Sequence, residues 1–248
     1  MHNGYKVKGV ADIVFLMDAT SDMQNCIDKF KENVGWFFKN LTEGDPESRH
    51  VPIVRDWRAK VVGFRDVEVD GDEWFEDNCF TRDIAEVERQ LGALTARGGG
   101  DMPESLLDAI YKVADAPKSE KGEEDPSAWR HRSEAHRVVV AFTDAPYKPT
   151  MSAPGIAGGD IRSLRNICVQ ERIFLTVVAP RGVDDDGFGM LAAIRYSNWI
   201  SIPSYLETSP LDGLMNDREA LTKMIQVLAW TIARPACHAN PPFPRTLI

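Results

Sequence analysis

Five acidic residues with the chemistry of cation ligands lie in three separated segments of the chain: Asp18 and Asp22 in Asp-Ala-Thr-Ser-Asp, Asp101 and Glu104 in Gly-Gly-Gly-Asp-Met-Pro-Glu, and Asp144 in Phe-Thr-Asp-Ala-Pro. Thr20 adds a hydroxyl group to the first segment. Carboxylate and hydroxyl oxygens are the ligands that Mg²⁺, Mn²⁺ and Ca²⁺ prefer. If the three segments meet at one end of a sheet, they predict a divalent-cation site.

Each segment also has a purely structural explanation. Asp101 to Glu104 has the pattern of an N-terminal capping box, with Asp as the cap, Pro in the first turn and Glu at the third position. Asp18 and Asp22 could cap the first long helix, and Asp144 could open a turn. For each segment taken alone, both explanations remain open.

The elements that must position these residues follow from the apolar pattern. Short apolar runs rich in β-branched residues predict strands, buried on both faces, at 13–17, 61–64, 138–142 and 173–178. Apolar residues at spacings of three and four predict helices over about 23–42, 84–94, 106–114 and 221–232. This alternation predicts a doubly wound, mostly parallel α/β sheet.

Ligands of such sheets bind beyond the carboxyl ends of the strands. Asp18 directly follows one predicted strand, and Asp144 follows another after a single threonine. We therefore expect both carboxylates at the ligand-binding edge of the sheet.

Composition limits the class of protein. A chain of 248 residues, 43% of them hydrophobic, can bury the core of one α/β domain, and its net charge of −9 argues against nucleic acid as a partner. Its N-terminus has no apolar signal region, and no apolar run reaches the roughly 18 residues of a membrane span. The cysteines are scattered without a close pair, which argues against structural zinc and a disulfide framework. These features predict a cytoplasmic protein that does not bind membranes.

Three segments lie outside the alternating pattern. We expect an N-terminal segment over 1–9, a domain over 10–233, and a Pro-rich tail over 234–248 that is either a frayed terminus or a docking arm. Within the domain, the charged stretch 117–134 predicts a solvated loop, with Trp129 as the residue that could anchor it.

The order of the motifs along the chain resembles a known family. Asp-Ala-Thr-Ser-Asp-Met after the first strand, Gly-Phe-Arg-Asp at 63–66, Gly-Gly-Gly-Asp-Met-Pro-Glu before a helix and Phe-Thr-Asp-Ala-Pro after a later strand together resemble a von Willebrand factor A (vWA) domain over roughly residues 10–233. The resemblance implies a six-stranded sheet with one antiparallel edge strand, helices on both faces, and a metal-ion-dependent adhesion site.

The resemblance also assigns the candidate ligands. Asp18 and Thr20 match the family's first loop, whereas Asp22 stands where the family usually has Ser, and Asp144 matches the third loop. The second loop resembles the Asp-x-Pro-Glu variant of alpha-kinase-associated and integrin β-subunit domains. In that variant Glu104 is the metal carboxylate, and Asp101 supports it or binds a neighbouring ion.

The function implied by the resemblance is docking to a protein partner through a bound Mg²⁺, Mn²⁺ or Ca²⁺, as a non-enzymatic subunit of a larger assembly. A partner ligand then fills an open coordination position of the ion. The extra charge of Asp22 disfavours an acidic partner ligand, because like charges 4 Å apart cost about 4 kcal/mol at an effective dielectric of 20. We therefore expect a tightly held ion, or one whose partner ligand is neutral.

Other functions remain open. A metal-assisted phosphoester hydrolase would need a cationic phosphate-binding group near the ion, for which Arg97 and Lys148 are the local candidates. A scaffold with a vestigial metal site is a further alternative. Residues 66–77 nearly match an EF-hand loop, but their flanks favour an acidic hairpin between two strands.

Overall fold

The computed structural model describes residues 9–43, 54–100, 102–202 and 210–233, and its centre is a six-stranded sheet of order β3-β2-β1-β4-β5-β6. The strands are β1 (Val10–Asp18), β2 (Asp56–Phe64), β3 (Phe75–Asp77), β4 (His136–Phe142), β5 (Ile173–Pro180) and β6 (Ser197–Ile202). All neighbouring pairs are parallel except β2 and β3, which are antiparallel. The predicted doubly wound α/β fold with one antiparallel edge strand is confirmed.

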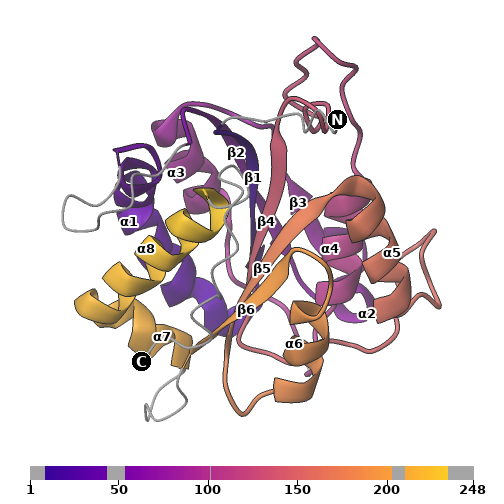
Figure 1. Cartoon of the computed structure of the whole chain (residues 1–248). Helices are drawn as coiled ribbons and strands as arrows, with labels where there is room; N and C mark the ends of the chain where they lie inside the picture. The colour runs from indigo at the N-terminus through magenta and orange to yellow at the C-terminus, as the bar shows by residue number, and fades with distance from the viewer. Residues whose placement is uncertain (1–8, 44–53, 101, 203–209, 234–248) are drawn as a thin grey trace.

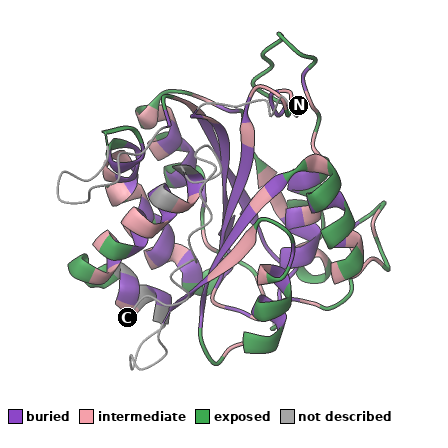
Figure 2. Ribbon diagram, viewed as in Figure 1, coloured by how far each residue is buried: buried purple, intermediate pink, exposed green. Residues whose placement is uncertain are grey.

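Two layers of helices cover the sheet (Figure 1). On one face lie α1 (Gln24–Glu43), α3 (Ile84–Ala93), α7 (Pro210–Asn216) and α8 (Arg218–Ala233). On the other lie α4 (Leu106–Asp115), α5 (Ile161–Glu171) and α6 (Asp185–Ala192), with the short α2 (Val67–Asp70) beside the N-terminal end of α4. The strands β1, β2, β4 and β5 are almost entirely buried between the layers (Figure 2), which explains the continuous apolar runs at 13–17, 61–64, 138–142 and 173–178.

The register aligns the carboxyl ends of three strands. Asp18 of β1 pairs with Phe64 of β2, and the preceding Met17 pairs with Phe142 of β4. The loops that follow β1, β2 and β4 therefore start at the same level of the sheet. This alignment brings the first and third predicted ligand segments to one edge.

The insertion at 117–134 is anchored rather than simply solvated. Trp129 is fully buried, packs against Phe80 and donates its indole N–H to the carbonyl of Val113 at 2.9 Å. Trp129 therefore anchors the insertion, as the sequence analysis allowed, because its indole is packed in an apolar site and its N–H has an acceptor. The middle of the insertion, at 120–127, is exposed as expected.

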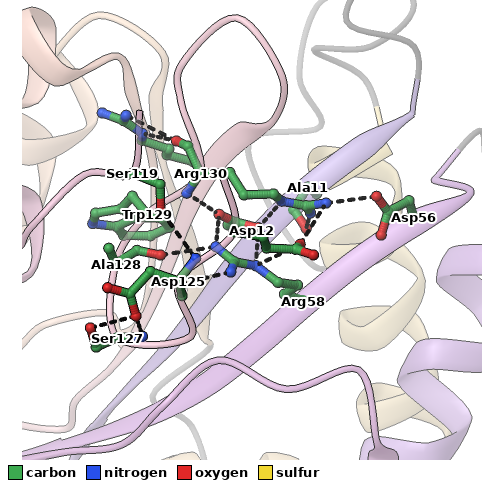
Figure 3. Close-up of polar contacts among 12 residues, drawn as sticks. Ala11, Asp12, Asp56, Arg58, Ser119, Asp125, Ser127, Ala128, Trp129 and Arg130 are labelled. Carbon is green, nitrogen blue, oxygen red and sulfur yellow. Dashed lines mark hydrogen bonds and ion pairs between the residues drawn. The ribbon is translucent and has the colours of Figure 1, made fainter. Parts of the chain in front are cut away.

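A buried charge network holds the same segment to the start of the sheet (Figure 3). Asp12 of β1 is fully buried and accepts from Arg58 of β2 and from Arg130 of the insertion, with its two oxygens shared between the guanidinium groups. Arg58 also donates to the carbonyls of Asp125 and Ala128. Arg130 also pairs with Asp56 at 2.6 Å, so two carboxylates balance the two guanidinium groups, whose charges would otherwise be costly to bury.

Other expected segments lie outside the part of the chain that the structure describes. These are the N-terminal segment, of which only Gly9 is described, and the whole Pro-rich tail. Among the described residues, no helix is long and apolar enough to cross a membrane.

Candidate metal centre

Asp18 forms the buried floor of the candidate site. Its Oδ1 accepts from the backbone N–H of Thr20 at 3.0 Å and from the Thr20 hydroxyl at 2.7 Å, while Oδ2 accepts from the Thr143 hydroxyl at 2.8 Å. Burial raises the pKa of Asp18, against these hydrogen bonds, which lower it. Each hydroxyl that donates to Asp18 keeps lone pairs for another partner, so Asp18 orients two potential oxygen ligands.

Gly99 lets the second loop approach the first. Its φ is +60°, and an added Cβ would lie 2.6 Å from Thr20 Cγ2 and 2.9 Å from Glu104 Oε1. Thr20 and Glu104 therefore converge on the same point of the Gly98–Gly100 backbone. The neighbouring Gly98, also at positive φ, leaves no room for a Cβ because the Asp70 carboxylate fills that position.

Glu104 is the most perturbed carboxyl group of the site. Its side chain is 4% exposed, and its Oε2 is buried with no hydrogen-bond partner among the described residues. Burial, together with the nearby charges of Asp18, Asp66 and Asp70, raises its pKa from 4.5 to about 8, although Lys148 opposes the rise. A buried carboxylate oxygen without a donor is the arrangement that a cation would complete.

The structure rejects the capping explanation for two segments. Helix α4 begins at Leu106 and its N-cap is Ser105, so Asp101 to Glu104 precede the helix instead of forming its first turn. The backbone of Glu104 instead pairs with the loop after β4, donating to Pro146 and accepting from Lys148. Asp18 lies in β1, before the N-cap Thr20 of the 3-10 turn η1 (Ser21–Met23), so it caps no helix.

The remaining predicted ligands are placed less centrally. Asp22 lies in η1 with its side chain exposed, at the rim rather than in the buried floor. Asp144 follows β4 and is partly buried, next to Thr143. Asp101 lies outside the described residues. Within the described ranges no three Asp, Glu, His or Cys side chains group closely enough to hold a metal by themselves, so any site needs hydroxyl ligands or Asp101.

Several residues that the sequence analysis did not assign to the site belong to it. Asp66 is fully buried after β2, caps α2 through the N–H of Glu68, and forms an ion pair with Lys148. Asp70 accepts from the N–H of Gly99 at 3.3 Å. Residues 66–77 therefore connect β2 to the antiparallel β3 through α2, as expected of an acidic hairpin, and also support the glycine loop. The Gly-Phe-Arg-Asp motif at 63–66 is the sequence signal that could have found Asp66, whereas Asp70 lies outside it.

The comparisons with known proteins agree with this geometry at the level of the fold. No family model matches the chain, and no curated protein matches it. A solved structure of proximal thread matrix protein 1 from the mussel byssus, with a zinc-occupied MIDAS motif, superposes with a TM-score of 0.53 at 14% identity. The fold is of the vWA type. The match covers 89% of this chain and 48% of that protein, so this chain spans about half the length of its vWA-type neighbour.

Proposed function

We propose that the chain is a protein-interaction module that binds a divalent cation at the carboxyl edge of its vWA-type sheet. The observation that carries the proposal is Glu104, whose Oε2 is buried without a hydrogen-bond partner among the described residues, while its other oxygen and the Thr20 side chain both lie against Gly99. Asp18, Thr20 and Glu104 would hold the ion, with Thr143 oriented by Asp18 and with Asp22, Asp101 and Asp144 completing the shell. Mg²⁺ or Mn²⁺ suits such an oxygen set, and Ca²⁺ is the other candidate.

Protein docking follows from the chemistry of an incompletely filled coordination shell. A divalent ion held by a few protein oxygens at a surface edge keeps water ligands, and a partner side chain can replace one of them. This chain's residues would position the ion and leave its outer side accessible. We propose a cytoplasmic module that works as a subunit of a larger assembly, with a metal-site ligand from a partner protein.

Asp22 makes the partner ligand unusual within that scheme. Its exposed carboxylate lies at the rim, where the family usually has a neutral Ser. An added negative charge there disfavours an acidic partner ligand and favours a neutral one. Calorimetric titration with Mg²⁺ and Mn²⁺ compares the wild type with Asp22→Ser, and equal affinities would contradict the charge argument.

The two cations that the hydrolase alternative would use to bind phosphate are both paired with carboxylates in the described part of the chain. Lys148 is bound to the carboxylates of Asp66 and Glu68, and Arg97 forms an ion pair with Glu73 at 2.6 Å. A phosphate would have to displace these carboxylates to reach either cation. We therefore propose a non-enzymatic role.

Two measurements test the proposal. Isothermal titration with Mg²⁺ or Mn²⁺ should show a single site that Asp18→Asn and Glu104→Gln each weaken at least tenfold. Affinity purification of partners with and without EDTA should show partners that disappear with the chelator. Unchanged partners in both buffers would instead support a scaffold with a vestigial site, and absent binding of both ions would refute the metal centre.

A further inference from the structure

Lys148 occupies the centre of a small carboxylate shell beside the candidate metal centre. Its ammonium nitrogen lies 2.8 Å from Asp66 Oδ1, 2.7 Å from Asp66 Oδ2 and 2.6 Å from Glu68 Oε2. One carboxylate therefore faces the ammonium with both oxygens and a second with one oxygen. Lys148 is 14% exposed, whereas Asp66 is completely buried, so the contact to Asp66 is shielded from water.

This arrangement has features of ion coordination. Asp66 Oδ2 is buried and has no hydrogen-bond partner among the described residues, where its contact is the ion pair with the Lys148 ammonium. Bidentate and monodentate carboxylates around one cation are also how proteins bind Ca²⁺, at oxygen distances of about 2.3–2.6 Å. The ammonium thus lies where three carboxylate oxygens already converge.

The other cation near these carboxylates is already engaged. Arg65 is fully buried and donates to the carbonyls of Ala19, Glu73 and Thr95, and it pairs with Glu76 at 2.7 Å. The hydrogen bonds of Arg65 thus link backbone segments. The cation that pairs with Asp66 is Lys148.

The shell is joined to the candidate metal centre through the backbone. The N–H of Lys148 donates to the carbonyl of Glu104 at 2.9 Å, and the next residue, Ser105, accepts from the N–H of Val67 at 3.0 Å. Asp66 and Asp70 also raise the pKa of Glu104, and Lys148 lowers it, so these charges lie close enough to influence that carboxyl group. Removing the ammonium would leave the carboxylates of Asp66 and Glu68 without their shared cation.

We propose that Lys148 is a tethered cation that fills a second cation position, formed by Asp66 and Glu68, and so limits this edge of the sheet to one divalent ion. Lys148 also keeps the acidic edge neutralised when no metal is bound. This inference depends on the proposed function only for the ion held by Asp18, Thr20 and Glu104. An ordinary salt bridge would give a different result, because its loss would destabilise the protein without creating a place for another ion.

The test replaces Lys148 with Met, which keeps much of the side-chain volume and removes the charge. Manganese binding per chain is counted by electron paramagnetic resonance, and the thermal midpoint is measured in EDTA and in millimolar Mn²⁺. We expect one Mn²⁺ for the wild type and two for Lys148→Met. We also expect the variant to have the lower midpoint in EDTA and the larger rise on adding Mn²⁺.

Matched variants isolate the second position. Arg97→Met removes an exposed cation from the same edge, where it pairs with Glu73, and should bind the wild-type number of ions. The double variant Asp18→Asn/Lys148→Met should bind one ion, at the Asp66 and Glu68 position. Adding Glu68→Gln to Lys148→Met should remove the extra ion.

The possible results separate the two proposals. One ion for both the wild type and Lys148→Met overturns the tethered cation and leaves the metal centre standing. If the wild type binds no ion and Lys148→Met binds one, the metal centre is refuted and the tethered cation is supported. If Lys148→Met fails to fold even in millimolar Mn²⁺, and Lys148→Gln does likewise, the position cannot accept a divalent ion and the inference is overturned.

Discussion

Replacing Glu104 with Gln tests whether this buried carboxyl group carries a proton in the metal-free protein. The folded structure raises its pKa from 4.5 to about 8, mainly by burial. A carboxyl group with a higher pKa in the folded state binds more protons when folded. Its contribution to stability is therefore greatest at low pH and is lost as the pH rises from 4.5 through 8.

The size of this effect follows from the pKa difference. Each unit of difference is worth 1.36 kcal/mol, so ionising Glu104 should lower the free energy of unfolding by about 3 kcal/mol between about pH 5 and about pH 8. For a domain of this size, that loss corresponds to a fall in the thermal midpoint of roughly 6–12 °C. Gln keeps the shape and a polar group but cannot ionise.

The assay is urea unfolding in EDTA at both pH values. The wild type should lose about 3 kcal/mol more than Glu104→Gln over this interval, because the other titrating groups are common to both proteins. Glu32→Gln, on the exposed outer side of α1, controls for the loss of one carboxylate from the overall charge. Equal pH dependence in the wild type and Glu104→Gln would refute the argument that burial keeps Glu104 protonated.

Three further substitutions test how the loops and the insertion are held. Gly99→Ala should cost at least about 2 kcal/mol in chemical denaturation, because it combines positive φ with overlap of Thr20 and Glu104. Gly122 also has a positive φ, but an added Cβ would have no neighbour within 4 Å. An equal loss of stability in Gly122→Ala would therefore show that the overlap with Thr20 and Glu104 does not contribute to the cost of Gly99→Ala. Asp12→Ala should cost about 3–5 kcal/mol, since it removes the buried carboxylate shared by Arg58 and Arg130, and a loss below about 1 kcal/mol would show that Asp56 and Glu124 suffice to compensate the two guanidinium groups. Trp129→Ala should cost about 3–5 kcal/mol and should make the insertion at 117–134 a preferred site of limited proteolysis; unchanged cleavage would show that the network around Asp12 suffices to hold it.

Much of the sheet and its helices is predictable from local patterns. The apolar runs at 13–17, 61–64, 138–142 and 173–178 all lie in strands, because strands buried on both faces need no polar alternation. Periodicity likewise predicts α1, α3, α4 and α8. The same patterns do not single out the strand β6 or the helices α5, α6 and α7. β6 begins with the polar pair Ser197 and Asn198, which interrupts the apolar run that marks the other strands.

Some features of the candidate site can likewise be predicted from local sequence, and others depend on the tertiary structure. The types and order of Asp18, Thr20 and Glu104 lead to the prediction of a cation site, but only through the resemblance of the whole set of motifs to a vWA domain. Sequence cannot distinguish a metal ligand from a helix cap at Glu104, because both explanations use the same residues. The position of the α4 N-cap at Ser105 decides against capping, since the start of the helix depends on the pairing of Glu104 with the loop beyond β4.

Sequence by itself determined the main strands and the residue types that follow them, since both are read from the apolar runs and the residues directly after them, whereas the sheet register decided that the strands end at one level. Only the tertiary structure decided which charges neutralise one another. Lys148 and Asp66 are 82 positions apart, and Asp12 and Arg130 are 118 apart, so neither pair belongs to a local motif. Electrostatic pairing depends on distance in space and on burial, and neither quantity is encoded in any single segment of the chain.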